Sequence, residues 1–387
     1  MTQYYFDHAA SAPRRDEVAD AMAPWQHGVV GNPSGSHKAA RDARRAVEEA
    51  RDEVAAFLGA KPGGVIFTGG GTESCALAIS GVTSLHRRTH ANSEILISRI
   101  EHHAVSDAAE KLAHDFDNVR VGFIDVDRDG VVDLDSLMSQ LSDDTALVSV
   151  MAANNETGVL QPLDGVSSLS KSIIPGGVLT HSDAVAAASW VKLATMTATT
   201  DMISICAHKI GGPVNSGALI LRSDIALEAL IPGGGQERGR RGGTVDVAAA
   251  VGLAAALRVT TKELDDVVDR VLDLQEKLVA AVSLIPGCVV TGRAALRVPG
   301  TVHVTFDDLA SDELLFLLDQ EGVCASAAAS CSSGAANPSH VLAAMGVSRE
   351  RARGSVRLSM GAETTDADVD AVIAILSNVV FRLRAEA

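Results

Sequence analysis

The sequence is poor in cysteine, in long apolar runs and in positive charge. Its five cysteines are odd in number and irregularly spaced, so they do not indicate a disulfide framework. No apolar stretch reaches the roughly 18 residues of a membrane span, and residues 1–7 lack a basic stretch before an apolar one. A net charge of −16 disfavours nucleic acid or an anionic membrane as a partner. We therefore expect a cytoplasmic protein that contacts neither of them directly.

What the sequence does contain is a repeated alternation of strand and helix patterns. Hydrophobic residues make up 47% of the chain and charged residues 21%, as in an ordinary globular enzyme. Helices are expected over 36–58 and from Thr72 onward, and strands over 65–67, 95–98, 119–124 and 146–151. This alternation predicts an α/β fold with a mostly parallel sheet covered on both faces.

A chain of 387 residues is too long for one small core. An alanine-rich helix is expected over 245–258, and a separate amphipathic helix over 260–284. We place a domain boundary between these two helices. Residues 16–258 are then a large domain, 259–387 a smaller α+β C-terminal domain, and 1–15 a segment that packs with the small domain.

Lys209 follows an apolar run, 201–206, and precedes a Gly-Gly-Pro turn. A strand that stops at a turn presents its last side chains at the edge of the sheet, where α/β folds bind ligands. A desolvated amine there can attack an aldehyde, as the Schiff-base lysine of a pyridoxal phosphate enzyme does. Asp183 ends the preceding apolar run, and such a carboxylate keeps a pyridine nitrogen protonated. The alternative is an ordinary surface lysine after a strand.

A glycine-rich segment, 67–74, follows one expected strand and opens the next helix. Glycines such as Gly71 allow a ligand to approach the backbone, Thr72 adds a hydroxyl, and a helix N-terminus attracts anions. The segment therefore predicts a phosphate-binding loop, with a simple tight turn as the alternative. Its spacing matches neither the dinucleotide fingerprint nor the Walker A pattern, which disfavours nucleotide binding.

His102 follows the expected strand that ends near Arg99. A ring at this edge can stack on a flat aromatic cofactor and move protons, although histidines at strand ends are usually polar turn residues. The adjacent pair His102-His103 lacks the spacing of a zinc-binding helix, and the other histidines are scattered. No metal site is therefore expected.

Polar residues near two further strand ends suit the binding of a substrate. Asn155 is one of two adjacent amides that follow the strand 146–151. Arg357 interrupts an apolar alternation, and a guanidinium there can hold a carboxylate in a bidentate fork. The alternatives are a turn built from turn-forming residues and a surface arginine on a strand edge.

Cys331 lies in a run of small residues, 325–337, that has no apolar periodicity. Such a run predicts a mobile loop with an accessible thiol, and reactive cysteines are partly exposed. A disulfide between Cys331 and Cys324 is the weaker hypothesis. The cysteines expected in the core are Cys75, Cys206 and Cys288.

In their order and spacing these features resemble the cysteine desulfurases that supply sulfur for iron–sulfur clusters, over essentially the whole chain. Each matching segment is weak alone, but together they are specific. The matching segments are 5–10, 31–34, 72–74, 101–102, 154–158, 161–162, 207–209, 233–237, 241–244, 338–342 and Arg357.

The resemblance implies the aspartate-aminotransferase-like fold (fold type I), pyridoxal 5'-phosphate as cofactor and a homodimer. Cys331 would take the sulfur of L-cysteine as a persulfide, release L-alanine, and pass the sulfur to an acceptor protein. The implied catalytic residues are Lys209, Cys331 and His102. The implied cofactor-binding residues are Gly71, Thr72, His102, Asn155, Asp183, Cys206, His208, Lys209 and Thr244, of which Thr244 reaches the partner subunit's cofactor. The implied substrate-binding residues are Asn32, Asn155 and Arg357.

Four positions differ from what this family usually has. Ala186 stands where a Gln touches the cofactor's phenolic oxygen, and Cys206 stands where a Ser binds the phosphate. Val214 replaces a Lys, and the segment 328–330 is Ala-Ala-Ser where Gly-Ser-Ala is usual. None of these changes removes an obligatory chemical group.

Two alternatives share parts of this pattern. Another class V pyridoxal phosphate enzyme, such as a selenocysteine lyase or an aminotransferase, would keep Lys209 and Asp183 but not need Cys331. A non-catalytic sulfur-transfer scaffold is suggested only by Ala186 and Cys206. The sulfur acceptor stays open between an iron–sulfur scaffold and a tRNA-thiolation protein.

Overall fold

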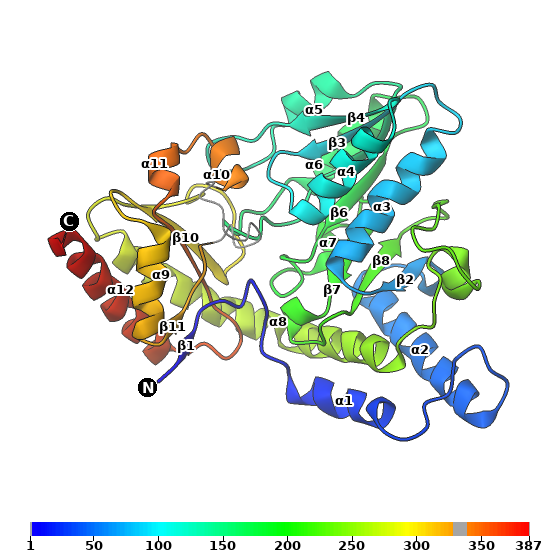
Figure 1. Cartoon of the computed structure of the whole chain (residues 1–387), viewed down its shortest axis with the longest axis horizontal. Coiled ribbons are helices and arrows are strands. Elements are labelled where there is room, and N and C mark those ends of the chain that lie inside the picture. The colour runs from blue at the N-terminus through cyan, green and yellow to red at the C-terminus, as the bar shows by residue number, and fades with distance from the viewer. Residues whose placement is uncertain (1, 328–338, 387) are drawn as a thin grey trace.

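The computed structural model describes residues 2–327 and 339–386, which leaves the predicted nucleophile Cys331 outside the described residues. A seven-stranded sheet lies at the centre of the larger part of the molecule, and a three-stranded sheet at the centre of the smaller part (Figure 1). The α/β fold predicted from the alternation of patterns is confirmed. In spatial order the strands of the large sheet are β2 (Val65–Thr68), β8 (Gly217–Leu221), β7 (Met202–Cys206), β6 (Leu179–Asp183), β5 (Thr145–Ser149), β3 (Ser93–Ser98) and β4 (Val119–Ile124).

Strand direction decides where the side chains at the strand ends gather. Strands β4, β3, β5, β6 and β7 pair in parallel, whereas β8 runs antiparallel to both of its neighbours, β7 and β2. The carboxyl ends of β2, β3, β5, β6 and β7 therefore meet at one edge of the sheet. This is the edge where parallel α/β sheets bind ligands.

Helices cover both faces of the large sheet because each strand in its centre is buried on both sides. One apolar cluster holds side chains of α1, α2, α6 and the first part of α8, and a second holds side chains of α3 and α4. The helices of this part are α1 (Asp16–Gln26), α2 (Lys38–Phe57), α3 (Gly71–His86), α4 (His103–Asp115), α5 (Leu134–Gln140), α6 (Leu163–Ser172) and α7 (Leu193–Met196).

The smaller part has its own apolar cluster, built around strand β10 between β9 and β12. Phe6 is fully buried in this cluster, and strand β1 pairs in parallel with β11, so the N-terminal segment lies against the smaller part. The elements are β1 (Tyr4–Tyr5), β9 (Cys288–Val290), β10 (Thr301–Phe306), β11 (Val323–Cys324), β12 (Ser355–Ser359), α9 (Ser311–Gln320), α10 (His340–Ala344), α11 (Arg349–Ala352) and α12 (Asp366–Glu386).

The expectation of two helices on either side of residue 259 is wrong. One helix of 36 residues, α8 (Val247–Val282), runs without interruption from the large part into the small part (Figure 1). Its residues up to Leu257 pack into the large-sheet cluster, and its residues from Val271 onward pack into the small cluster. The domain boundary proposed near residue 259 thus falls inside α8, between the residues that pack into the first core and those that pack into the second. The division into domains stays a proposal. Among the helices described, none combines the length and the apolarity needed to cross a membrane.

A buried ion pair ties α2 to the loop that carries Arg241 and Thr244. Arg51 donates to both carboxylate oxygens of Glu237, at 2.9 and 2.7 Å, and also to the carbonyl of Val65. Glu237 in turn accepts the backbone N–H of Phe67 on β2. The Arg51 and Glu237 side chains are 4% and 2% exposed, so solvent cannot replace either partner. The pair holds Glu237 in a left-handed backbone conformation (φ 46°) that is uncommon for residues other than glycine.

Arg51→Ala should lower the free energy of unfolding by about 3 kcal/mol, because it leaves the Glu237 carboxylate buried without its partner. Chemical denaturation followed by circular dichroism measures the loss. Arg45→Ala on the same helix is the matched control. Its side chain is 69% exposed, and losing such a surface pair should cost less than about 1 kcal/mol. Equal losses in the two variants would contradict a stabilising role for the buried pair.

Candidate active site

One pocket at the carboxyl edge of the large sheet contains most of the predicted site residues. It is open to solvent and encloses about 910 Å³. The predicted residues that line it are Gly71, Thr72, His102, Asn155, Asp183, Cys206, His208, Lys209 and Arg357. They come from the carboxyl ends of β6 and β7, from the segments after β2, β3, β5 and β7, and from β12 of the smaller part. The pocket therefore lies where the two parts of the molecule meet.

Lys209 lies in a short 3-10 turn, His208–Ile210, that begins directly after β7. Gly211 ends this turn in a left-handed conformation (φ 76°), which suits glycine and turns the chain away from the sheet. The Lys209 ammonium donates to the carbonyls of Ala9 and Ala10, at 2.6 and 2.8 Å. Burial lowers the pKa of Lys209, because a desolvated site disfavours the charged form. The lower pKa makes it easier for Lys209 to lose its proton and form the neutral amine that a nucleophile or base requires.

Asp183 is the last residue of β6 and is buried. Its Oδ1 accepts the backbone N–H of Val185 at 2.9 Å. Burial raises its pKa, while that N–H, the nearby His102, the Cys75 thiol and Lys209 lower it. A carboxylate in this position suits one positively charged N–H group of a ligand.

His102 caps the N-terminus of α4, and its Nδ1 accepts the backbone N–H of Ala104 at 3.0 Å. In a neutral ring the proton must then lie on Nε2. Burial lowers the pKa of His102, which favours this neutral form. The ring lines the same pocket as Asp183 and Lys209.

The predicted phosphate loop lies at the start of α3. Gly70 has a φ of 143°, a backbone conformation open to glycine, and the helix then begins at Gly71 with its first N–H groups unpaired within the helix. Glu73 brings a negative charge into this first turn, but Arg241 pairs with it at 2.8 Å. His208 also lines the pocket, and burial lowers its pKa to about 4, so it presents a neutral ring.

Arg357 on β12 reaches the pocket from the smaller part of the molecule. Its two terminal nitrogens donate to the carbonyl of Asn155 at 2.9 Å and to Asp7 at 2.8 Å. Its Nε is buried and has no hydrogen-bond partner among the described residues. Asp7 was not singled out from the sequence; its only signal was that it falls within a segment matching the family. It places a carboxylate on the guanidinium that is predicted to bind the substrate's carboxylate.

The structure does not bring Asn32 and Thr244 into the Lys209 pocket of their own chain. They lie beside each other, with the Asn32 amide donating to the Thr244 hydroxyl at 3.4 Å. Thr244 lines a separate hollow with Gly69 and Arg241. The predicted role of Thr244 at a partner subunit's cofactor, and that of Asn32 in substrate binding, stay predictions.

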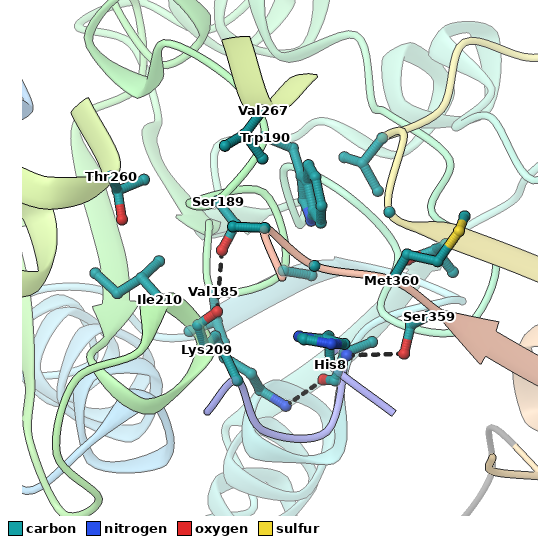
Figure 2. A pocket seen from close by; sticks show the side chains of 18 of the residues that line it. His8, Val185, Ser189, Trp190, Lys209, Ile210, Thr260, Val267, Ser359 and Met360 are labelled. Carbon is teal, nitrogen blue, oxygen red and sulfur yellow. Dashed lines mark hydrogen bonds between the residues drawn. The ribbon is translucent and has the colours of Figure 1, made fainter. Parts of the chain in front are cut away.

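A second cavity of about 790 Å³ adjoins the pocket on the other side of Lys209. Figure 2 shows Lys209 between Ile210 and the N-terminal segment that carries His8, with Trp190 and Val267 across the cavity. Ala186 lines both cavities and adds no side-chain hydrogen-bonding group to either. At the position where the family resemblance implies a glutamine amide, this chain therefore offers only a methyl group.

Cys206, where a phosphate-binding serine is usual, is buried at the end of β7. Burial raises the pKa of its thiol to about 12, so the sulfur stays protonated at neutral pH. The backbone N–H groups of His208 and Lys209 interact with this sulfur. Cys206 thus contributes a neutral thiol to the pocket. In the residues that the structure describes, no cluster of three or more His, Cys, Asp or Glu side chains is arranged to hold a metal ion.

The donor set fits pyridoxal 5'-phosphate. Free helix N–H groups, the Thr72 hydroxyl and a neutral His208 suit the phosphate, and the buried Asp183 suits a pyridinium N–H. The chain belongs to the aminotransferase class-V family, a family dependent on pyridoxal phosphate, whose model matches residues 4–372. This confirms the family resemblance and the cofactor predicted from the sequence.

Three relatives illustrate the similarity. The chain is 40% identical to an IscS-like cysteine desulfurase of Mycobacterium tuberculosis, over 98% of this chain and 97% of that protein. A solved NifS-like protein superposes with a TM-score of 0.91 at 31% identity, over 98% of this chain and all of the other. A structure of SspA in complex with cysteine superposes with a TM-score of 0.81 at 28% identity, over 94% of this chain and 100% of SspA.

Glu101 precedes His102 beside the pocket and was not singled out from the sequence. It is 1% exposed, and its Oε1 accepts from Ser98 at the end of β3 and from the backbone N–H of Met151 after β5. Its Oε2 is buried with no partner among the described residues. Burial raises its pKa to about 8, so the side chain is neutral at pH 7. It joins the ends of two strands at the edge that carries the pocket.

Glu101→Gln should flatten the pH dependence of stability between pH 5 and pH 8. The folded state keeps a proton on Glu101 up to about pH 8, whereas the unfolded chain loses it near 4.5. The wild-type contribution is therefore complete below 4.5 and is lost as pH rises, by about 1.4 kcal/mol per pH unit. Denaturation midpoints across this range measure the slope. The exposed variant Glu110→Gln should keep the wild-type slope, and an unchanged slope in Glu101→Gln would contradict the assignment.

Proposed function

We propose that the protein is a pyridoxal-phosphate-dependent L-cysteine desulfurase that forms L-alanine and leaves a persulfide on Cys331. The observation that carries the proposal is a single pocket holding an amine, a buried carboxylate, an imidazole, a guanidinium and an anion-binding loop. Similarity over nearly the full length to a protein named as a cysteine desulfurase supports the reaction, and the SspA complex supports cysteine as substrate.

Five side chains hold the cofactor in this proposal. Thr72 and His208, with the first N–H groups of α3, bind the phosphate. Asp183 would pair with the pyridine nitrogen, His102 would lie against the ring, and Lys209 would supply the amine that holds the aldehyde end. Bound there, the cofactor supplies an electron sink for the negative charge that develops at the substrate's α-carbon.

Arg357 and Asn155 orient the substrate through its carboxylate. Arg357 is confined by its hydrogen bonds to Asn155 and Asp7, so its terminal nitrogens are already aimed before substrate arrives. A substrate carboxylate that binds this guanidinium approaches the Asp7 carboxylate, and repulsion between the two favours displacement of Asp7. The α-carbon is thereby directed toward Lys209.

Lys209 then takes the α-proton of the substrate. A base must be neutral to do so, and burial favours the neutral amine by lowering its pKa. While it is charged, Lys209 is held by the carbonyls of Ala9 and Ala10, and these bonds weaken when a proton is lost. His102, neutral with its proton on Nε2, is a second group that can pass a proton within the pocket.

Cys331 supplies the thiolate that attacks the substrate sulfur. A sulfur–sulfur bond forms, the carbon–sulfur bond breaks, and the electron pair of that bond stays with the carbon fragment that leaves as alanine. The persulfide then passes to an acceptor, either an iron–sulfur scaffold or a tRNA-thiolation protein. The homodimer, in which Thr244 reaches the partner's cofactor, and the cytoplasmic location complete the proposal.

Lys209→Ala should abolish the covalent cofactor link that borohydride makes permanent, because no amine remains beside Asp183. Reduction with borohydride followed by peptide mapping locates the attachment. Lys192→Ala, a lysine with a 65% exposed side chain, is the control and should keep the link. Finding the reduced cofactor on another lysine would rule out Lys209 as the attachment site.

Cys331→Ser should still bind the cofactor and L-cysteine but should release neither alanine nor sulfide, because a serine hydroxyl is a poor nucleophile at neutral pH. Mass spectrometry of the wild-type protein after cysteine treatment should show an added sulfur on the peptide that contains Cys331. Cys324→Ser is the matched control and should stay active. Near wild-type alanine production by Cys331→Ser, or sulfur mapped to Cys324, would refute the desulfurase mechanism.

A further inference from the structure

Two buried polar atoms of the small sheet have no hydrogen-bond partner among the described residues. One is Nε of Arg357 on β12, and the other is Nε2 of His303 on β10. His303 is fully buried, and Arg357 is 3% exposed. Buried polar groups in folded proteins nearly always have a hydrogen-bond partner, so each of these two atoms is expected to find one.

The pairing of the strands places the two side chains next to each other. His303 and Arg357 lie directly opposite each other in the antiparallel pair of β10 and β12. The backbone N–H and C=O of Arg357 both bond to Ser326, on the other side of β12. His303 and Arg357 are therefore a non-hydrogen-bonded pair, in which the Cα atoms are only about 4.5 Å apart and both side chains point to the same face of the sheet.

The face that carries these two side chains is polar and turns toward the large part of the molecule. Along β10 the alternate residues Val302 and Val304 pack into the small apolar cluster, whereas Thr301 lines the second cavity. His303 lies on the same face as Thr301, two residues further along the strand. Arg357 lines the candidate active-site pocket and His303 does not, so His303 can act on a bound substrate only through Arg357.

The other ring nitrogen of His303 is already engaged. Its Nδ1 lies 2.8 Å from the hydroxyl of Thr291, which follows β9 on the opposite side of β10 from β12. The two nitrogens lie on different edges of the ring, so with Nδ1 at Thr291 the ring can present Nε2 to the β12 side. His303 is neutral, because burial lowers its pKa to about 3. With its one proton on Nδ1 and donated to Thr291, Nε2 is an acceptor.

We propose that His303 is a positioning residue for Arg357, and that its Nε2 accepts the Nε–H of Arg357 through one bridging water molecule. The proposal rests on the role of Arg357 at the substrate carboxylate described above. The two terminal nitrogens of Arg357 bond to Asn155 and Asp7. When a substrate carboxylate displaces Asp7, the bond to Asn155 and the water-mediated bond to His303 remain. They keep the guanidinium aimed at the substrate.

Two substitutions separate the two ring nitrogens of His303. The amide of Gln reaches the position of Nε2, whereas the shorter amide of Asn reaches that of Nδ1. His303→Asn should raise KM for L-cysteine about fivefold, the effect of losing one hydrogen bond, and should change kcat by less than about twofold, because carboxylate binding is lost equally in the ground and transition states. His303→Gln should keep the wild-type KM. Initial rates of alanine formation measure both constants, and an equal rise of KM in the two variants overturns the proposal.

Nitrogen NMR tests the link between the two residues without catalysis. In protein labelled at histidine and arginine, the His303 signals, assigned by their loss in His303→Gln, should show the proton on Nδ1. The Arg357 Nε–H, assigned by its loss in Arg357→Lys, should exchange with solvent about fivefold more slowly in the wild type than in His303→Asn. A proton on Nε2, or equal exchange in the two proteins, overturns the proposal.

Arg357→Lys distinguishes a failure of this proposal from a failure of the proposed function. If it leaves KM for L-cysteine unchanged, Arg357 does not bind the substrate carboxylate, and the substrate-binding role of both residues fails. The NMR signals still decide whether His303 holds Arg357. If Arg357→Lys raises KM while His303→Asn does not, Arg357 keeps its role and only the role of His303 is overturned.

Discussion

The pocket depends on keeping Asp183 charged although its side chain is buried. Burial raises the pKa of Asp183 and so disfavours that charge, whereas the backbone N–H of Val185 and the nearby Lys209 lower the pKa. The same burial makes His102 and His208 neutral and lowers the pKa of Lys209. One condition, burial at the sheet edge, therefore shifts the pKa of Asp183, His102, His208 and Lys209.

Much of the site could be predicted because strand ends are visible in a sequence. Apolar runs that stop at Asp183 and before Lys209 mark the carboxyl ends of β6 and β7, which are neighbours in the sheet. The glycine-rich run marks the end of β2 in the same way. Because these strands run in the same direction, their carboxyl ends lie at one edge of the sheet. This can be inferred without knowing the conformation of any loop. The site residues at the strand ends of the large sheet could therefore be predicted from the sequence.

What could not be predicted depends on contacts between distant parts of the chain. No local sequence pattern predicts the contact between Asp7 and Arg357, because 350 residues separate them. Glu101 was not singled out, because its bond to Met151 depends on the register of β3 against β5. Asn32 and Thr244 lie outside the pocket of their own chain, and no sequence pattern gives that position. The family resemblance supplied roles for these residues but not their surroundings.

The continuity of α8 gives the molecule a mechanical property. At 1.5 Å per residue its 36 residues make a rod roughly 54 Å long, and each end is embedded in a different core. Loosening of either core frees one end of the helix and exposes the apolar side chains that pack there. The two cores are therefore coupled in stability. Relative movement of the two parts must bend the rod or slide side chains along it, so the molecule resists the free hinging that a flexible linker would allow.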